Sequence, residues 1–170
     1  MQKQTITLIG MPACGKSTVG VLLAKTLGLA FIDTDLLIQQ RTGRLLADIL
    51  AADGIEAFLR IEAAALLAVD AAGAVIATGG SAVYSHAGMA HLKASGSVVF
   101  LDIPPEEAAR RIADITARGV VARAGQSIAD LYAERLPLYQ KWADSTFAVS
   151  GKTTEQLVQE IAEFARGDLS

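Results

Sequence analysis

The chain has 170 residues, a length that fits one compact domain and leaves little room for a second. Apolar residues make up 52% of the chain and charged residues 19%, so it can bury a core and is not intrinsically disordered. The formal net charge of −3 lacks the basic excess that a nucleic-acid-binding protein needs. We therefore expect a single domain over residues 1–170 with no nucleic acid as its main partner.

The sequence also predicts a cytoplasmic protein without a membrane span. A single cysteine, Cys14, permits no internal disulfide, and residues 1–10 lack the long apolar stretch of a signal peptide. The longest unbroken apolar run covers residues 63–69, which is far shorter than the roughly 18 residues needed to cross a bilayer.

Short apolar runs alternate with helical patterns along the chain. Ile6, Leu8 and Ile9 predict a first strand that ends at Gly10, and a helical pattern follows as far as Gly28. Further strands are expected at 30–32, 74–77, 97–101 and 146–149, and further helices at 44–52, 54–69, 86–95, 105–117, 127–142 and 153–166. Because parallel strands need crossovers long enough for a helix, this alternation predicts a three-layer α/β/α fold around a parallel sheet.

The least regular segment covers residues 117–126. Two glycines and two arginines interrupt the helical periodicity there, among them Arg118. We expect this segment to form a mobile lid.

Residues 10–17 carry the clearest chemical signal. Their sequence, GMPACGKS, fits the pattern GxxxxGK[ST] and lies between a predicted strand and a predicted helix, which is the context that the pattern requires. Glycines let the main chain approach a polyphosphate, and the start of the helix adds unpaired N–H groups. The expected nucleotide site consists of Gly10, Met11, Pro12, Ala13, Cys14, Gly15, Lys16, Ser17 and Thr18.

Two residues of this loop have specific expected roles. Lys16 should reach the β and γ phosphates as a point charge, and the Ser17 hydroxyl should ligate Mg²⁺. The sequence therefore predicts a site for a nucleoside triphosphate with magnesium. Kinases, switch GTPases and ATP-driven machines all share such a loop.

Asp33 and Asp35 follow the second predicted strand. In an open parallel sheet, ligands gather at the carboxyl ends of the strands, so both acids are expected beside the phosphate loop. One carboxylate can hold Mg²⁺ through water, and the other can orient an attacking hydroxyl or accept its proton. The alternative is that Asp35 caps a helix and Asp33 is a solvated surface acid.

Six segments carry a family resemblance along nearly the whole chain. In order they are LIGMPACGKSTVG, FIDTD, RTGRLLADILAADGIEAFLRIE, VIATGG, VVFLDIPPEEAARR and ERLPLYQKWAD. In these segments the chain resembles the shikimate kinase family. The resemblance implies a monomeric enzyme with a five-stranded parallel sheet of order 2-3-1-4-5. Such an enzyme transfers the γ-phosphate of ATP to a ring hydroxyl of shikimate.

The resemblance also implies roles on the nucleotide side. Lys16 and Ser17 match the family's phosphate and magnesium residues, and Asp33 matches the acid near the metal. Arg111 matches an arginine over the adenine, and Arg118 a lid arginine near the phosphates.

On the substrate side, the resemblance gives Asp35 the role of gripping the acceptor hydroxyls. Gly79 and Gly80 match the first two glycines of a triple-glycine turn whose backbone approaches the substrate. Arg135 matches an arginine that binds the substrate carboxylate.

The chain departs from the family pattern at three places. Leu59 follows Phe58 where the family has a clamping arginine, Ser81 replaces the third glycine, and Gly119 follows the lid arginine in place of a proline. Since Leu59 and Ser81 are expected to shape the substrate pocket, a related kinase acting on another hydroxy acid or polyol stays open. A nucleotide-binding switch or regulator without an acceptor is a third reading.

Overall fold

The computed structural model describes residues 4–70, 72–112 and 119–167. Its strands are β1 (Thr5–Ile9), β2 (Ala30–Asp33), β3 (Ala74–Ala77), β4 (Gly96–Asp102) and β5 (Ser145–Ala148). Its helices are α1 (Lys16–Leu27), α2 (Thr34–Thr42), α3 (Leu46–Leu67), α4 (His86–Ser95), α5 (Pro105–Arg111), α6 (Ile128–Trp142) and α7 (Thr154–Gly167), with a 3₁₀ turn, η1 (Ala82–Tyr84), after β3.

The strands form one parallel sheet in the order β2-β3-β1-β4-β5. β1 lies in the centre, where Ile6 pairs with Val75 of β3 and with Ser97 of β4. All five residues of β1 and all four of β3 are buried, as expected for strands covered on both faces. The predicted parallel sheet and its order are confirmed.

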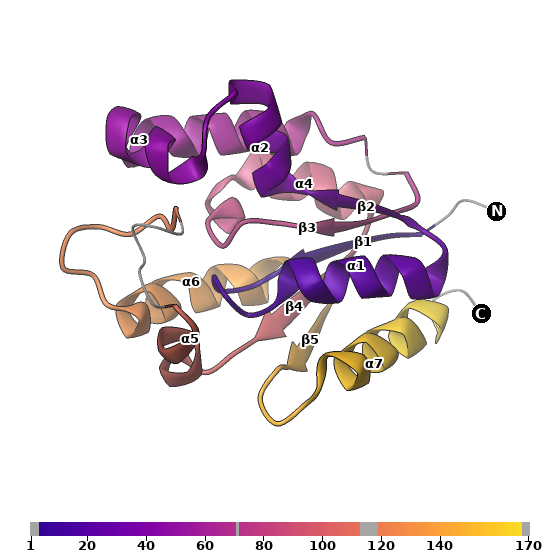
Figure 1. Ribbon diagram of the computed structural model, residues 1–170. Coiled ribbons are helices and arrows are strands. Elements are labelled where there is room, and N and C mark those ends of the chain that lie inside the picture. The colour runs from indigo at the N-terminus through magenta and orange to yellow at the C-terminus, as the bar shows by residue number, and fades with distance from the viewer. Residues whose placement is uncertain (1–3, 71, 113–118, 168–170) are drawn as a thin grey trace.

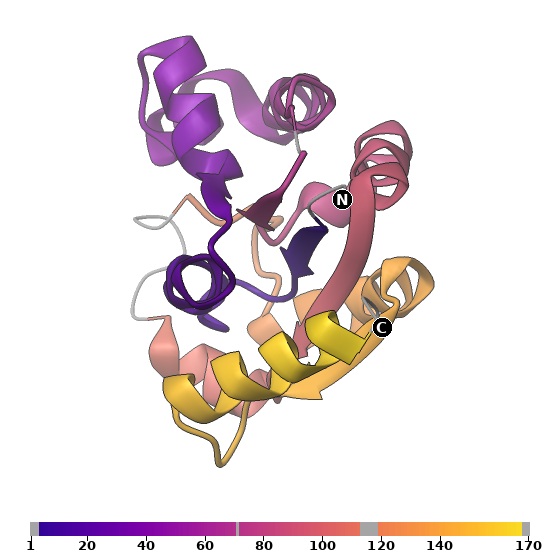
Figure 2. The same cartoon turned by 90° about the vertical axis from the view of Figure 1, so that its right-hand side faces the viewer.

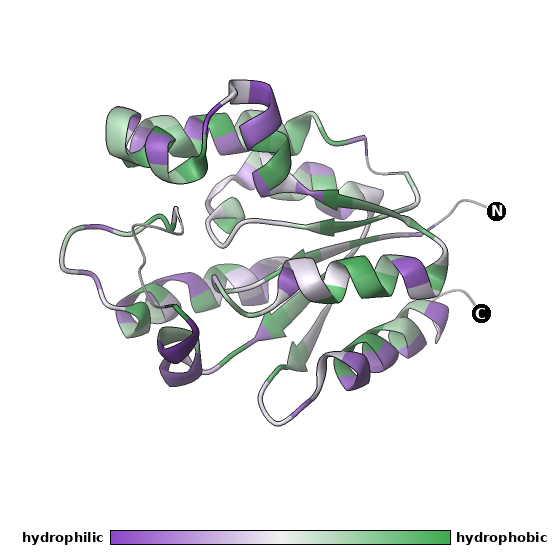
Figure 3. Ribbon diagram, viewed as in Figure 1, coloured by the Kyte–Doolittle hydropathy of each residue, from purple (hydrophilic) through white to green (hydrophobic). Residues whose placement is uncertain are grey.

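Helices cover both faces of the sheet. α1 and α7 pack together on one face, and α4 and α6 lie on the other (Figures 1 and 2). Figure 3 shows mostly hydrophobic strands, whereas α7 alternates between hydrophilic and hydrophobic residues. The apolar side of α7 is buried, because the residues at helical spacing, Leu157, Val158, Ile161, Ala162 and Ala165, face the core.

The two helices predicted at 44–52 and 54–69 form one helix, α3, with a break. Gly54 has φ 81° and ψ 176°, a conformation that favours glycine and interrupts the helix. α3 packs against α2 and α4. A second apolar cluster forms there from Ile38, Leu46, Ile49, Phe58, Ala65 and Val121.

Two segments predicted from the sequence are described only in part by the structure. The helix predicted at 105–117 is seen as α5, which ends at Arg111, and residues 113–118 lie outside the described part of the chain. The predicted lid, 117–126, is described only from Gly119 onward, so its mobility stays a prediction. Among the described residues, no helix is both long and apolar enough to cross a membrane.

Gly96 lies where β4 approaches β1 closely, so a substitution there tests how tightly these two strands pack. It is the register partner of Thr5, and a Cβ at this position would clash with the Thr5 carbonyl oxygen. We expect Gly96→Ala to lower the free energy of unfolding by about 2 kcal/mol or more, because strand backbone cannot yield as a side chain does. Urea unfolding measures this. Gly167→Ala is the matched control, since a Cβ there would meet no atom within 4 Å, and equal stability of the two variants would contradict the prediction.

Candidate active site

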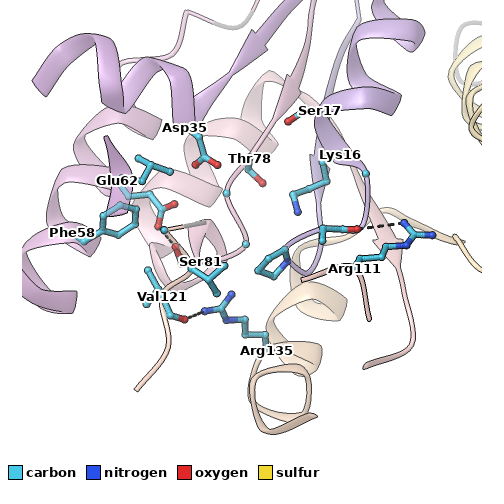
Figure 4. A pocket seen from close by; sticks show the side chains of 18 of the residues that line it. Lys16, Ser17, Asp35, Phe58, Glu62, Thr78, Ser81, Arg111, Val121 and Arg135 are labelled. Carbon is cyan, nitrogen blue, oxygen red and sulfur yellow. Dashed lines mark hydrogen bonds between the residues drawn. The ribbon is translucent and has the colours of Figure 1, made fainter. Parts of the chain in front are cut away.

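The carboxyl ends of β2, β3 and β1 lie side by side and open into one cavity of about 570 Å³. The loop 10–15 follows β1, α2 follows β2, and residues 78–81 follow β3. The cavity brings together most of the predicted site residues, namely Pro12, Ala13, Gly15, Lys16, Ser17, Thr18, Asp35, Gly79, Gly80, Ser81, Arg111 and Arg135. Residues from α2, α3 and α6 thus face the phosphate loop across a shared space (Figure 4).

The phosphate loop has the backbone that its sequence predicts. Gly10 and Gly15 have positive φ, and a Cβ at Gly10 would meet the carbonyl oxygen of Leu101 at 2.5 Å. Among the described residues, no side chain caps α1 at Gly15, so the first N–H groups of this helix are available to an anion. Gly10, Met11 and Cys14 do not line the cavity, and these three residues of the loop are buried.

The Lys16 side chain is fixed by hydrogen bonds to the backbone of this loop. Its Nζ donates to the carbonyl oxygens of Gly10 and Met11, at 2.8 Å each. The side chain is buried yet lines the cavity, so its ammonium is positioned before any phosphate arrives. A fixed cation beside free backbone N–H groups suits a polyphosphate chain.

Ser17 and Asp33 meet although sixteen positions separate them in the sequence. The Ser17 hydroxyl donates to Asp33 Oδ2 at 2.8 Å. Asp33 Oδ1 accepts from the backbone N–H groups of Asp35 and Leu36, so Asp33 caps α2. The alternative of Asp35 as the cap is therefore wrong, because the chain enters α2 one residue earlier, at Thr34.

This pair fits a magnesium ion in its donor chemistry, since Mg²⁺ prefers hydroxyl, carboxylate, water and phosphate oxygens. In residues 4–70, 72–112 and 119–167, no group of three or more His, Cys, Asp or Glu could hold a metal ion by itself. A magnesium ion at Ser17 and Asp33 would therefore take its other ligands from water and phosphate.

Two carboxylates face the cavity from α2 and α3. The pKa of Asp35 is raised to about 6, mainly by burial and then by the charge of Asp33, while Lys16 lowers it. The pKa of Glu62 is raised to about 7, mainly by burial and also by Asp35, although a hydrogen bond from Ser81 and the charges of Arg135 and Lys16 oppose this. Glu62 is 1% exposed.

Sequence reasoning gave Glu62 no role. A signal was present, because Glu62 lies four residues after Phe58 on the helix face that carries the core residues Ala65 and Leu66. A charged residue on a buried helix face points to a partner or a site.

Arg135 lies opposite these acids, on α6. Its Nη2 donates to the Val121 carbonyl oxygen at 2.6 Å, and its Nε donates to the Tyr84 hydroxyl at 3.2 Å. Nη1 is buried and has no hydrogen-bond partner among the described residues. An unpartnered guanidinium N–H beside a cavity is suited to bind an anion.

Arg111 lies at the other end, beside the phosphate loop. Its Nη2 pairs with Glu107 at 2.6 Å and its Nη1 donates to the Ala13 carbonyl oxygen at 3.4 Å. Arg118, the predicted lid arginine, lies outside the described residues.

Leu59 is not placed with the other substrate-side candidates. It lines a second cavity of about 150 Å³, together with Tyr84 and Arg123. Consecutive helical residues point about 100° apart, so Phe58 faces the main cavity and Leu59 does not. Val121 lines both cavities, whereas Leu59 lines only the second.

A phosphate loop, a serine–aspartate pair and a cavity that continues toward acids and a free guanidinium define the class of phosphate-loop kinases. The family follows from comparison with known proteins. The family model described as shikimate kinase matches residues 12–166. This chain therefore belongs to the shikimate kinase family, a family of ATP-dependent kinases.

Individual relatives agree with this assignment. The shikimate kinase of Clostridium botulinum (strain Eklund 17B / Type B) is 37% identical over 162 residues, which cover 94% of this chain and 95% of that protein. The shikimate kinase of Mycobacterium avium (strain 104) is 45% identical over 144 residues, covering 80% and 78%. A structure of shikimate kinase from Acinetobacter baumannii in complex with shikimate superposes with a TM-score of 0.88 at 30% identity, covering 98% and 94%. The resemblance deduced from the six sequence segments is confirmed.

The raised pKa of Glu62 predicts a pH-dependent stability. Between its usual value of 4.5 and about 7, the folded chain binds a proton more tightly than the unfolded chain. This carboxyl's contribution to the free energy of unfolding therefore falls as pH rises through that window, by about 3 kcal/mol at about 1.4 kcal/mol per pKa unit. Glu62→Gln should lack this fall, so its stability relative to the parent chain should rise between pH 4.5 and pH 8.

Urea unfolding at several pH values measures the difference between the two chains. Glu155→Gln is the control, because Glu155 is exposed on α7. A constant difference between the Glu62→Gln variant and the parent chain would contradict the burial argument.

Proposed function

We propose that this chain transfers the γ-phosphoryl group of ATP to a hydroxyl of shikimate. One observation carries the proposal: a single cavity joins the phosphate loop at Lys16 to a carboxylate, Asp35, and to the free Nη1 of Arg135. Shikimate offers hydroxyls and a carboxylate, which these two groups complement. Membership of the shikimate kinase family supports the same acceptor.

On the nucleotide side, residues 10–15 and the first N–H groups of α1 bind the phosphates, and Lys16 pairs with the β and γ phosphates. Ser17 and Asp33 hold a magnesium ion, which supplies charge neutralisation on the phosphate oxygens when bound. Arg111 lies beside the loop at Ala13 and is assigned to the adenine side. Arg118 keeps its expected role at the phosphates as part of the proposal.

On the acceptor side, Arg135 binds the carboxylate and the backbone at Gly79 and Gly80 approaches the ring. Asp35 accepts a hydrogen bond from the attacking hydroxyl and orients its oxygen toward the γ-phosphorus. A bond forms between that oxygen and phosphorus while the bond from phosphorus to the β–γ bridging oxygen breaks. The hydroxyl proton passes to Asp35, whose raised pKa makes it a competent acceptor. The monomeric state and the cytoplasmic location expected from the sequence stay predictions.

Lys16→Ala tests the nucleotide side. Removing the fixed ammonium should lower ATP-dependent phosphorylation of shikimate at least about 100-fold, because this charge is offered to the transferred group. A coupled ADP-release assay measures the loss. Lys25→Ala, an exposed lysine in the last turn of α1, is the control. Retained turnover in a folded Lys16→Ala variant would refute the assignment.

Arg135→Lys tests the acceptor side. We expect the KM for shikimate to rise roughly ten- to a hundredfold, since a hydrogen bond to a charged group contributes about 1.5–3 kcal/mol. A cyclitol without a carboxylate should be turned over equally by both chains. Because Arg135 is also buried, replacing it can lower the stability of the fold. The thermal unfolding midpoint of the Arg135→Lys variant is therefore measured alongside its kinetics.

A panel of shikimate, quinate, other hydroxy acids and cyclitols completes this assay. Two carboxylates, Asp35 and Glu62, face the cavity opposite one free guanidinium, which favours a polyol as the second candidate acceptor. Faster turnover of a cyclitol than of shikimate in the parent chain would replace the proposed acceptor by that class.

A further inference from the structure

Ser81 places a hydroxyl where the main cavity meets α3. The residue follows Gly79 and Gly80 and has φ −91°, so its side chain is accommodated without backbone strain. It is 5% exposed and lines the cavity. Its hydroxyl donates to Glu62 Oε1 at 2.7 Å, the bond drawn beside Ser81 in Figure 4. This bond fixes one oxygen of the Glu62 carboxylate and therefore the direction of the other.

The second oxygen, Glu62 Oε2, is buried and has no hydrogen-bond partner among the described residues. A Cβ built on Gly79 would lie 2.8 Å from this oxygen and 2.7 Å from Asp35 Oδ1. Two carboxylate oxygens from different helices therefore border the same small space. A side chain at residue 79 would fill this space.

The charged groups around Glu62 come from three other helices. They are Lys16 on α1, Asp35 on α2 and Arg135 on α6. None of them forms an ion pair with Glu62 within 4 Å in the described part of the chain. A buried carboxylate oxygen without a partner is costly, and a hydroxyl donor from a ligand would satisfy it.

We propose that Ser81 is a positioning residue that directs Glu62 Oε2 to accept a hydrogen bond from a second hydroxyl of the acceptor. That hydroxyl neighbours the one held by Asp35, so the site selects acceptors with two adjacent hydroxyls on one face of the ring. The proposal rests on the proposed function, because it needs an acceptor in this cavity. It adds a selection rule that neither Asp35 nor Arg135 supplies.

Ser81→Ala removes the hydroxyl and leaves the backbone unchanged. We expect the KM for the acceptor to rise about tenfold while the KM for ATP stays within about twofold, since Ser81 acts on the acceptor end alone. Ser81→Thr keeps a hydroxyl and should restore the parent value. Ser95→Ala is the matched control, because Ser95 is exposed at the end of α4 and does not line the cavity.

An acceptor analogue that lacks the second hydroxyl sharpens the test. The parent chain should bind it about tenfold more weakly than the full acceptor, whereas Ser81→Ala should discriminate little between the two. A purely structural role for Ser81 would weaken both acceptors equally in the variant, which would overturn the proposal.

The titration of Glu62 gives a readout that needs no turnover. Its pKa is about 7, and the Ser81 hydrogen bond lowers it. In the acceptor-free chain, carbon NMR of the labelled Glu62 carboxyl should show a higher midpoint in Ser81→Ala than in the parent. The kcat/KM for the acceptor should rise with pH through this titration, because the ionised carboxylate accepts the stronger hydrogen bond. Glu62→Gln should remove that part of the profile, and Glu155→Gln should not.

The two proposals fail separately. If the parent chain does not phosphorylate shikimate, the proposed acceptor is wrong, and the Ser81 measurements proceed with whichever panel compound is turned over. If Ser81→Ala leaves the acceptor KM and the Glu62 midpoint unchanged, or raises the KM values for acceptor and ATP equally, the role of Ser81 is wrong even though the kinase assignment stands.

Discussion

The parallel arrangement of β2, β3 and β1 is the constraint on which the site depends. Parallel neighbours end on the same side, so the loop after β1, the acids after β2 and the glycine turn after β3 must meet. Each of these segments is short and fixed by its own local bonds, such as the capping of α2 by Asp33. Phosphate binding and acceptor binding are thus brought together by strand order, not by loops that fold around a ligand.

The buried charged groups at the two ends of the cavity differ in their hydrogen bonding. Beside the loop, the Lys16 ammonium donates to two carbonyl oxygens and to Cys14 Sγ. At the far end, Glu62 Oε2 and Arg135 Nη1 are buried and have no hydrogen-bond partner in the part of the chain that the structure describes. Such atoms are rare in folded chains, and finding one of each sign beside the same space indicates that a polar ligand completes them. Under the proposed function, the acceptor is the ligand that supplies these hydrogen bonds.

Local sequence patterns predicted much of this site. The remaining residues depend on which way their side chains point in the folded chain. The phosphate loop was readable because its glycines and Lys16 lie close together within residues 10–17. Asp33 was expected beside it because ligands gather at the carboxyl ends of parallel strands, but its hydrogen bond with Ser17 was seen only in the structure. Leu59 could not be placed, since whether a helical residue faces a cavity depends on the rotation of α3, which packing against α2 and α4 decides. Glu62 was missed for the same reason. It lies among the core residues of α3, and only the structure shows that this face of the helix also borders the cavity.

Val121 belongs to two parts of the molecule at once. Its side chain packs with Ile49 and Phe58 in the second apolar cluster, while its carbonyl oxygen holds Arg135. Hydrocarbon packing among α2 and α3 is thereby coupled to the orientation of the guanidinium. A change of shape at Ile38 or Ile49, which do not line the cavity, would therefore reach Arg135 through Val121 while every polar residue stays in place.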